Sequence, residues 1–321
     1  MIRLLGMGNA LTDVIMPIES DEILHELGLP KGSMQLIDQE KFNLIHARVA
    51  DLPKSLVCGG SAANTVTGAS KLGVHSGFIG KVHQDEVGRN YKDDLHSYGV
   101  TSFLLDGQQS SGQSLVFVSP DGERTFATYL GAAASLLPED IMPDFFRGSN
   151  LFYIEGYLVQ NHDLVLKAVQ MAREEGLKVA LDLASYNVVE ENLSFLRNVI
   201  ESYVDIVFAN EEEAKALTGL QPAEALESIA SLVEIAVVKV GAHGAMAIRG
   251  SEKVHVPAVE ANCIDTTGAG DLFASGFIYG MFTGQSLTDC IRYGTITAGS
   301  VIEVMGAKMP DVSWDAIRSN F

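Results

Sequence analysis

Apolar and polar positions follow two alternating rhythms from about residue 150 onward. Short apolar runs have the length of buried strands, and between them apolar side chains recur every three or four positions, as in amphipathic helices. The expected strands span 150–158, 178–184, 205–210 and 235–240, and the expected helices span 162–176, 191–203 and 211–219. Strands that alternate with helices predict a mostly parallel sheet with helices on both faces.

The first 135 residues do not follow this rhythm. The apolar segment 1–16 predicts one first strand, and residues 114–130 predict two strands around Pro-Asp-Gly, a hairpin signal. Residues 15–38 mix apolar and polar positions without a clear period. We interpret these stretches as a small β-rich lid, formed by about 14–40 and 100–130, on a single domain that spans 1–321.

Composition narrows the classes of function. With 22 Lys and Arg against 41 Asp and Glu, the net charge is −19, which disfavours nucleic acids and anionic membranes as partners. No apolar run reaches the roughly 18 residues that span a bilayer. The 3 cysteines lack zinc-ligand spacing and favour a reducing compartment over a disulfide framework. We therefore expect a cytoplasmic protein, monomer or homodimer, that binds a small molecule.

The segment 265–271, Asp-Thr-Thr-Gly-Ala-Gly-Asp, points to chemistry. It joins an extended segment to a helical run, so the N–H groups of residues 268–270 lie at a helix start, where they can bind an anion. Asp271 stands in the first turn. Amides that neutralise a phosphoryl group, beside a carboxylate that accepts a hydroxyl proton, are the parts that phosphoryl transfer needs. Taken alone, these residues also fit a tight turn with an acid that offsets the helix dipole.

The longer string 265–277 resembles the C-terminal signature of the ribokinase-like, or PfkB-type, carbohydrate and nucleoside kinases. Four other motifs precede it in that family's order. They are the opening strand with Asn9 and Asp13, the second signature with Gly59, Gly60 and Asn64, an Asn-x-x-Glu pattern at Asn210 and Glu213, and Lys-x-Gly-x-x-Gly at Lys239, Gly241 and Gly244. Together the five motifs cover nearly the whole chain, which is far more specific than any one of them.

The resemblance implies a role for each group of residues. Asp271 would be the base that takes the proton from the substrate hydroxyl, and the anion hole would consist of Gly268, Ala269 and Gly270. The substrate pocket would contain Asn9, Asp13, Gly59, Gly60 and Asn64, with Gln35 and Arg124 from the lid. ATP and Mg²⁺ would contact Asn210, Glu213, Lys239, Gly241, Gly244 and Thr266, with Glu213 holding Mg²⁺ through water. Asp265 and Thr267, beside the segment 304–310, would form the monovalent-cation (K⁺) site that some members have.

Several of these residues also have an ordinary structural interpretation. Asn9 and Asp13 are residue types that form turns and caps. Lys239 also fits a strand lysine whose stem is buried, and Arg124 also fits a solvated hairpin arginine. For Gly59, Gly60 and Asn64, a closely packed strand-to-helix turn is compatible with substrate binding.

We therefore expect a ribokinase-like fold with a three-layer α/β/α core, a mostly parallel central sheet and a lid. The expected activity is ATP-dependent phosphorylation of the primary hydroxyl of a nucleoside. Adenosine is favoured because the chain resembles the adenosine-kinase-like branch, and because Gln35, Leu36 and Ile37 combine an amide with apolar side chains, as a purine requires. A sugar kinase shares every motif and stays open, as does a non-catalytic sensor. Dinucleotide binding at 6–11 is disfavoured because Leu11 replaces the third glycine of that fingerprint.

Overall fold

Two β-sheets organise residues 3–321, the part of the chain that the computed structural model describes. The larger sheet has the strand order β14-β13-β12-β11-β10-β9-β1-β5-β6, parallel from β6 to β12 and antiparallel at β13 and β14. Its strands are β1 (Leu4–Met7), β5 (Ser76–Val82), β6 (Thr101–Asp106), β9 (Leu151–Glu155), β10 (Lys178–Asp182), β11 (Ile206–Asn210), β12 (Ile235–Lys239), β13 (Ala245–Arg249) and β14 (Glu252–Val256).

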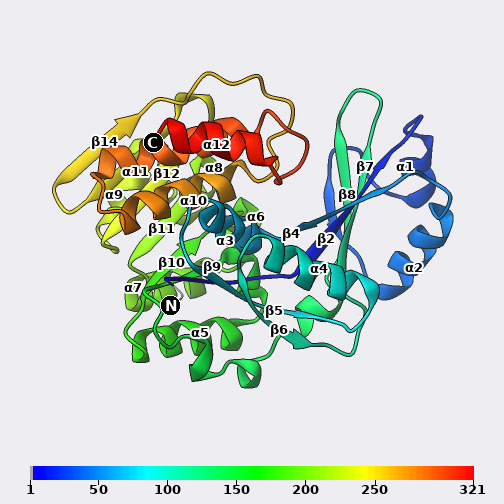
Figure 1. The fold of residues 1–321 in the computed structure, drawn as a ribbon, viewed down its shortest axis with the longest axis horizontal. Coiled ribbons are helices and arrows are strands. Elements are labelled where there is room, and N and C mark those ends of the chain that lie inside the picture. The colour runs from blue at the N-terminus through cyan, green and yellow to red at the C-terminus, as the bar shows by residue number, and fades with distance from the viewer. Residues whose placement is uncertain (1–2) are drawn as a thin grey trace.

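Both faces of this sheet are apolar and covered by helices. Successive side chains of a strand point to opposite faces, and in β11 Val207 and Ala209 join one core cluster while Ile206 and Phe208 join another. The first cluster lies against α5 (His162–Glu174), α7 (Leu193–Tyr203), α8 (Glu211–Thr218) and α9 (Pro222–Ala230). The second lies against α3 (Ser61–Lys71), α4 (Glu86–Ser97), α10 (Ala269–Phe282) and α11 (Leu287–Val301). The predicted three-layer α/β/α core is therefore confirmed (Figure 1).

The smaller sheet is the lid, and its strand order is β3-β8-β7-β2-β4. Its strands are β2 (Leu11–Pro17), β3 (Met34–Leu36), β4 (Ser55–Gly59), β7 (Gly112–Val118) and β8 (Arg124–Tyr129). Helices α1 (Glu22–Leu27) and α2 (Gln39–Arg48) bury one of its faces with a separate apolar cluster. Figure 1 shows this sheet and its two helices to one side of the large layers. The remaining helices are α6 (Tyr186–Glu191) and α12 (Asp311–Ser319).

The lid differs in extent from the predicted 14–40 and 100–130. Strand β6, inside the second range, pairs with β5 at the edge of the large sheet. Strand β4, outside both ranges, pairs with β2 in the lid. Helix α2 also extends beyond residue 40. The hairpin predicted around Pro-Asp-Gly is present as β7 and β8.

The prediction of one strand over 1–16 is wrong, with its residues 1 and 2 lying outside the described residues. The segment forms two strands, β1 in the large sheet and β2 in the lid. Residues 8–10 belong to neither strand, and an added Cβ on Gly8 would lie 2.2 Å from Oε2 of Glu155. Glycine suits this close approach, and after it Asn9 lies in the link between the two sheets and Asp13 lies in β2 of the lid. In the described part of the chain, every helix is too short or too polar to span a lipid bilayer.

Candidate active site

Polar side chains gather where four neighbouring parallel strands end. Glu155 ends β9, Asp182 ends β10, Asn210 ends β11 and Lys239 ends β12. In open α/β sheets, ligands bind outside the carboxyl ends of the strands. The start of α10 reaches the same edge, because an added Cβ on Gly270 would lie 3.0 Å from Nζ of Lys239.

Helix α10 begins in the glycine-rich segment, as the sequence predicts. Gly268 caps the helix with φ +77°, and an added Cβ there would lie 2.5 Å from Cβ of Ala307. The N–H of Ala269 donates to the carbonyl of Thr266 over 3.2 Å, so this amide is occupied by a turn. The N–H groups of Gly268 and Gly270 have no acceptor among residues 3–321. Two of the three expected amides are therefore available to an anion.

Asp271 lies in the first turn of α10 and is held by α3. Ser61 Oγ donates to its Oδ1 over 2.7 Å, and Asn64 Nδ2 donates to its Oδ2 over 3.0 Å. Burial raises the pKa of Asp271 to about 6, against the lowering effect of these two hydrogen bonds. Such a carboxylate is ionised at neutral pH and has a pKa close enough to neutrality to accept a proton and release it again.

Lys239 and Asp182 form an ion pair beside this turn. Nζ of Lys239 lies 3.1 Å from Oδ2 of Asp182, and both side chains are largely buried. Burial alone would lower the pKa of Lys239, but the carboxylates of Asp182 and Glu213 outweigh it and the pKa is raised. The ammonium group therefore stays charged next to the available N–H groups at the start of α10.

Glu155 joins the segment that contains Asn9 to the start of α3. Its Oε1 accepts from the backbone and side-chain N–H groups of Asn9, both at 2.9 Å, and its Oε2 accepts from the N–H of Ala62 at 2.9 Å. Gly60, which precedes α3, has φ +96°, and an added Cβ would lie 2.3 Å from the carbonyl oxygen of Asn9. Asn9, Gly60 and the start of α3 thus form one rigid unit, with Oδ1 of Asn64 buried and without a hydrogen-bond partner in the described part of the chain.

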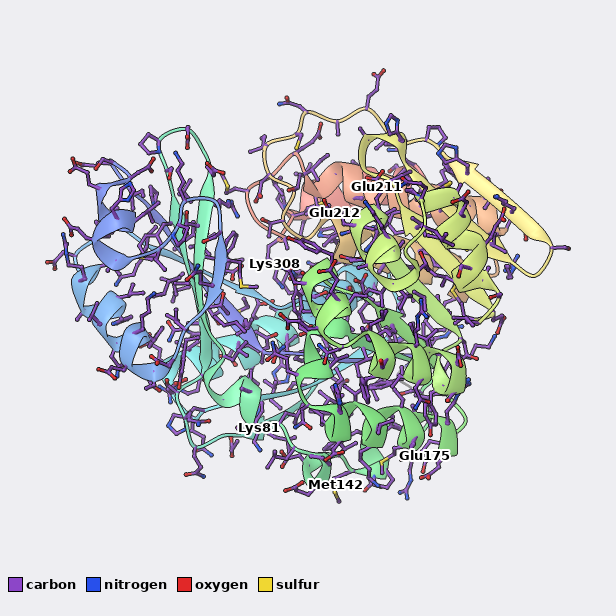
Figure 2. All side chains as sticks on the ribbon, turned by 180° about the vertical axis from the view of Figure 1, so that it is seen from behind. Lys81, Met142, Glu175, Glu211, Glu212 and Lys308 are labelled. Carbon is purple, nitrogen blue, oxygen red and sulfur yellow. The ribbon has the colours of Figure 1, made fainter. Side chains whose placement is uncertain are left out.

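Asp13 and Arg124 come from the lid. An added Cβ on Gly59 would lie 3.4 Å from Oδ2 of Asp13, so this glycine leaves room beside the carboxylate. Burial raises the pKa of Asp13 to about 6, and the positive charge of Arg124 partly offsets this. Lys308 lies between the lid and the α/β/α core (Figure 2), and its positive charge also lowers the pKa of Asp13.

Arg124 reaches from β8 to the segment before α10. Its guanidinium lies 2.9 Å from Oδ2 of Asp265 and donates to Oγ1 of Thr267 over 3.2 Å. Asp265 also accepts from the N–H and hydroxyl of Thr267 and from the N–H of Gly306, at 3.1, 2.8 and 2.6 Å. The structure thus brings together Arg124, Asp265 and Thr267, and protein donors engage both oxygens of Asp265.

Asn210 and Glu213 form a capping box at the start of α8. Both oxygens of Glu213 accept from Asn210, at 2.8 Å from its backbone N–H and 2.7 Å from its side chain. Burial raises the pKa of Glu213 to about 7, while Lys239 lowers it. The neighbouring Glu211 and Glu212 are exposed (Figure 2). Within residues 3–321, no three His, Cys, Asp or Glu side chains are grouped to hold a metal ion by themselves.

Of the remaining predicted site residues, two lie in a tight turn after β12 and two are partly or fully exposed. Gly241 and Gly244 follow β12 with φ +53° and +91°, and an added Cβ on Gly244 would lie 2.0 Å from the carbonyl oxygen of Val256. Thr266 is exposed in the loop before α10. Gln35 is half-buried in β3.

Two neighbouring cavities lie near the lid, and Asn9 lines the larger of them. One, of about 310 Å³, is lined by lid residues and the following turn: Leu36, Ile37, Gln109, Thr128, Tyr129, Leu130, Gly131, Ala134 and Ser135. The other, of about 640 Å³, shares Leu130 and Ala134 and is also lined by Asn9, Ala133, Leu136 and Tyr157 to Leu164 apart from Val159. Leu36 and Ile37 line the smaller cavity as expected, but Gln35 does not.

Three residues of the site were missed by the sequence analysis: Ser61, Glu155 and Asp182. Ser61 lies within the second signature, between Gly60 and Asn64, so the sequence motif could have indicated that Ser61 is a site residue. Glu155 and Asp182 are single acids at the carboxyl ends of predicted strands. An acid that ends a run of buried apolar residues is itself unusual and marks the ligand edge of a parallel sheet.

Comparisons with known proteins show which family the chain is similar to. The family model described as pfkB family carbohydrate kinase matches residues 46–314. A 5-dehydro-2-deoxygluconokinase from Halalkalibacterium halodurans is 32% identical over 263 residues, which cover 76% of this chain and 79% of that protein. An uncharacterized sugar kinase from Archaeoglobus fulgidus is 30% identical over 75% of this chain and 96% of its own length.

Two solved structures match nearly the whole chain. The adenosine kinase from Sinorhizobium meliloti has a TM-score of 0.89 and 36% identity, and covers 100% of this chain and 99% of its own. A probable sugar kinase from Rhizobium etli CFN 42 has a TM-score of 0.89 and 35% identity, with 99% and 98% covered. These matches confirm the ribokinase-like fold with its lid. The chain belongs to the pfkB family of carbohydrate kinases and is a phosphotransferase that acts on an alcohol group.

Proposed function

We propose that this kinase transfers the γ-phosphate of ATP to the primary hydroxyl of a nucleoside, with adenosine as the preferred acceptor. The observation that carries the transfer is the start of α10. There the carboxylate of Asp271 and the unoccupied N–H groups of Gly268 and Gly270 lie within one turn of helix, and the ammonium of Lys239 at the end of β12 lies beside Gly270. A base, an anion hole and a fixed positive charge are the groups that phosphoryl transfer requires.

In this mechanism Asp271 accepts the proton of the acceptor hydroxyl as the hydroxyl oxygen attacks the phosphorus. The N–H groups of Gly268 and Gly270 donate to the oxygens of the transferred group, and Lys239 offsets their charge from the other side. Arg124, held by Asp265, provides a second positive group that the lid brings to the same edge. These groups are already in place, so little reorganisation is needed at the moment of transfer.

The donor set also fits a magnesium ion bound with the nucleotide. Mg²⁺ usually keeps several waters and uses one or two carboxylates together with substrate phosphates, which agrees with the absence of a dedicated ligand cluster in residues 3–321. Glu213 and Asn210 would hold it through water, because the oxygens of Glu213 each keep a lone pair beyond the capping box. When bound, the ion would offset charge on the phosphate oxygens.

The acceptor is inferred from the cavities around Asn9. Asn9, Asp13, Gly60 and Asn64 would bind the hydroxyls of a ribose, with Oδ1 of Asn64 as an acceptor to which no group of residues 3–321 donates. The adjoining apolar walls, which include Leu36, Leu130 and Ala134, suit the flat faces of a base. The similarity to the adenosine kinase from Sinorhizobium meliloti supports the same choice.

A sugar acid is the second candidate acceptor. The curated relatives at 30% identity or more act on sugars by name, among them the 5-dehydro-2-deoxygluconokinase. The larger cavity also has polar groups at its far end, namely Gln160, Asn161, His162 and Asp163. These groups could bind the hydroxyls or carboxylate of a sugar acid.

A coupled ADP-release assay separates these possibilities. The acceptors are adenosine, inosine, guanosine, cytidine, ribose, fructose, 2-keto-3-deoxygluconate and 5-dehydro-2-deoxygluconate. We expect the highest kcat/KM with adenosine, and a sugar that wins while adenosine gives nothing would overturn the nucleoside assignment. If none of these acceptors led to ADP release, both acceptor assignments would be wrong.

The matched variant in this assay is Asp271→Asn. We expect it to lower kcat by about 10²–10⁴, the usual contribution of a positioned base, with acceptor binding nearly unchanged. A variant that keeps more than about a tenth of the wild-type kcat would show that Asp271 is not the base.

A further inference from the structure

Two side chains of α3 hold both carboxylate oxygens of Asp271. Ser61 and Asn64 are three residues apart in the first turn of that helix and therefore share one face. Ser61 Oγ bonds Oδ1 over 2.7 Å and Asn64 Nδ2 bonds Oδ2 over 3.0 Å. With both oxygens engaged, the carboxylate has one orientation instead of rotating about its terminal bond.

The two helices that carry this contact are fixed against each other. Thr65 Oγ1 donates to the backbone carbonyl of Asp271 over 3.2 Å. One turn further along α3, an added Cβ on Gly68 would lie 2.7 Å from both Cδ1 of Leu272 and Oγ of Ser275, so the helices are in close contact there. At its start, α3 is tied to Glu155 through the N–H of Ala62. Ser61 is thus held against Asp271 by the backbone around it.

Asn64 and Ser61, the two donors to Asp271, differ in their other contacts. Asn64 belongs to the proposed ribose-binding group, and its Oδ1 has no partner among the residues that the structure describes. A change at Asn64 would therefore affect the acceptor and the base together. Ser61 has one side-chain hydrogen bond within the described residues, the one to Asp271. Ser61 is the position at which the contact with the base can be tested alone.

We infer that Ser61 is a positioning residue of the phosphotransfer step, whose hydroxyl holds the carboxylate of Asp271 in the orientation that accepts the proton. The inference rests on the proposed function, in which Asp271 is the base. It adds a group that acts on the base and not on either substrate.

The hydrogen bond from Ser61 also affects the pKa of Asp271. Burial raises the pKa of Asp271, and the hydrogen bonds from Asn64 and Ser61 lower it because they favour the ionised form. The titratable and charged groups that face Asp271 are Lys239 from β12, Asp182 from β10, Tyr153 and Glu155 from β9, Tyr157 from the turn after β9, and Glu213 from α8. They stay in place when Ser61 changes, so loss of its hydroxyl moves the pKa of Asp271 upward.

The test compares Ser61→Ala, Ser61→Thr and Ser70→Ala by steady-state ADP release across pH, with MgATP and adenosine, or 5-dehydro-2-deoxygluconate if the acceptor assay favours it. Ser70 is the matched control, because it lies in the same helix, is similarly half-buried and donates its hydroxyl to the carbonyl of Tyr98 over 2.6 Å. Rates are taken below the unfolding temperature of each variant.

For Ser61→Ala we expect kcat to fall about tenfold and the acid limb of the kcat profile to move up by about one pH unit, since a hydrogen bond to a charged group is lost. The KM of the acceptor should change little. Ser61→Thr, which keeps the hydroxyl, should restore both, and Ser70→Ala should match wild type.

Three results would overturn the inference. They are an unshifted acid limb in Ser61→Ala, a change confined to the acceptor KM, or a Ser61→Thr variant that behaves like Ser61→Ala. Failure of the proposed function itself would look different, because Asp271→Asn would then keep its turnover whatever Ser61 does.

Discussion

Replacing Glu155 by Gln should change how the stability of the protein depends on pH. Glu155 is 1% exposed, and burial raises its pKa from 4.5 to about 7, against hydrogen bonds from Ala62 and Asn9 that lower it. An acid with a raised folded-state pKa stabilises the fold fully below its unfolded pKa and loses that contribution as pH rises through the folded pKa. The glutamine side chain does not titrate, so the variant lacks this loss.

The size of this change in stability follows from the pKa shift of Glu155. A difference of one pKa unit corresponds to about 1.4 kcal/mol, so the shift of Glu155 removes about 2 to 3 kcal/mol of stability from the wild type between pH 5 and pH 8. Relative to wild type, Glu155→Gln should therefore gain about that amount over the same interval. For a chain of 321 residues this is about 3 to 5 °C in unfolding temperature.

The assay is thermal or urea unfolding of both proteins at half-unit steps from pH 5 to pH 8. Glu227→Gln is the flat control, because Lys253 lowers the pKa of the exposed Glu227 below its ordinary value. That carboxylate is ionised in both folded and unfolded protein from pH 5 to pH 8, so the stability of this variant relative to wild type should stay constant. A constant difference between Glu155→Gln and wild type as well, or one that falls as pH rises, would refute the argument from burial.

Two further predictions concern the metal and the backbone. Chelation of Mg²⁺ should abolish ADP release, and Glu213→Gln should raise the Mg²⁺ concentration for half-maximal rate severalfold, whereas an unchanged Mg²⁺ titration would assign Glu213 to capping α8 alone. Gly60→Ala should lower the free energy of unfolding by at least about 1–3 kcal/mol, since φ is +96° and the new Cβ would meet the carbonyl of Asn9. Urea unfolding measures this, and a loss below about 0.5 kcal/mol would contradict the strain.

Much of the large sheet could be predicted because its signals are local. The strands β9 to β12 are short apolar runs, and the helices between them carry their apolar residues at helical spacing. The start of α10 could be predicted as well, because glycines before a helical run indicate a turn. Gly268 indeed has φ +77°, which glycine adopts without strain. Each of these features depends on residues within one element.

The lid could be predicted only as a region. Whether β4 and β6 join the small or the large sheet depends on their partners, which are β2 for β4 and β5 for β6, and not on their own residues. Hydrophobic periodicity carries no information about the partner of a strand. The break between β1 and β2 has the same origin, because β1 pairs with β5 and β9 in the large sheet and β2 pairs with β4 and β7 in the lid.

The site shows the same division between local and tertiary information. Strands β9, β10, β11 and β12 are neighbours in the order of the chain, so the polar residues at their carboxyl ends could have been placed side by side from sequence. Strand β1 breaks that order, because it lies between β9 and β5. This insertion brings Asn9, just past β1, against Glu155 at the end of β9. The contacts that join Asn9, in the proposed acceptor pocket, through Glu155 to the start of α3 therefore depend on one strand position that no local pattern specifies.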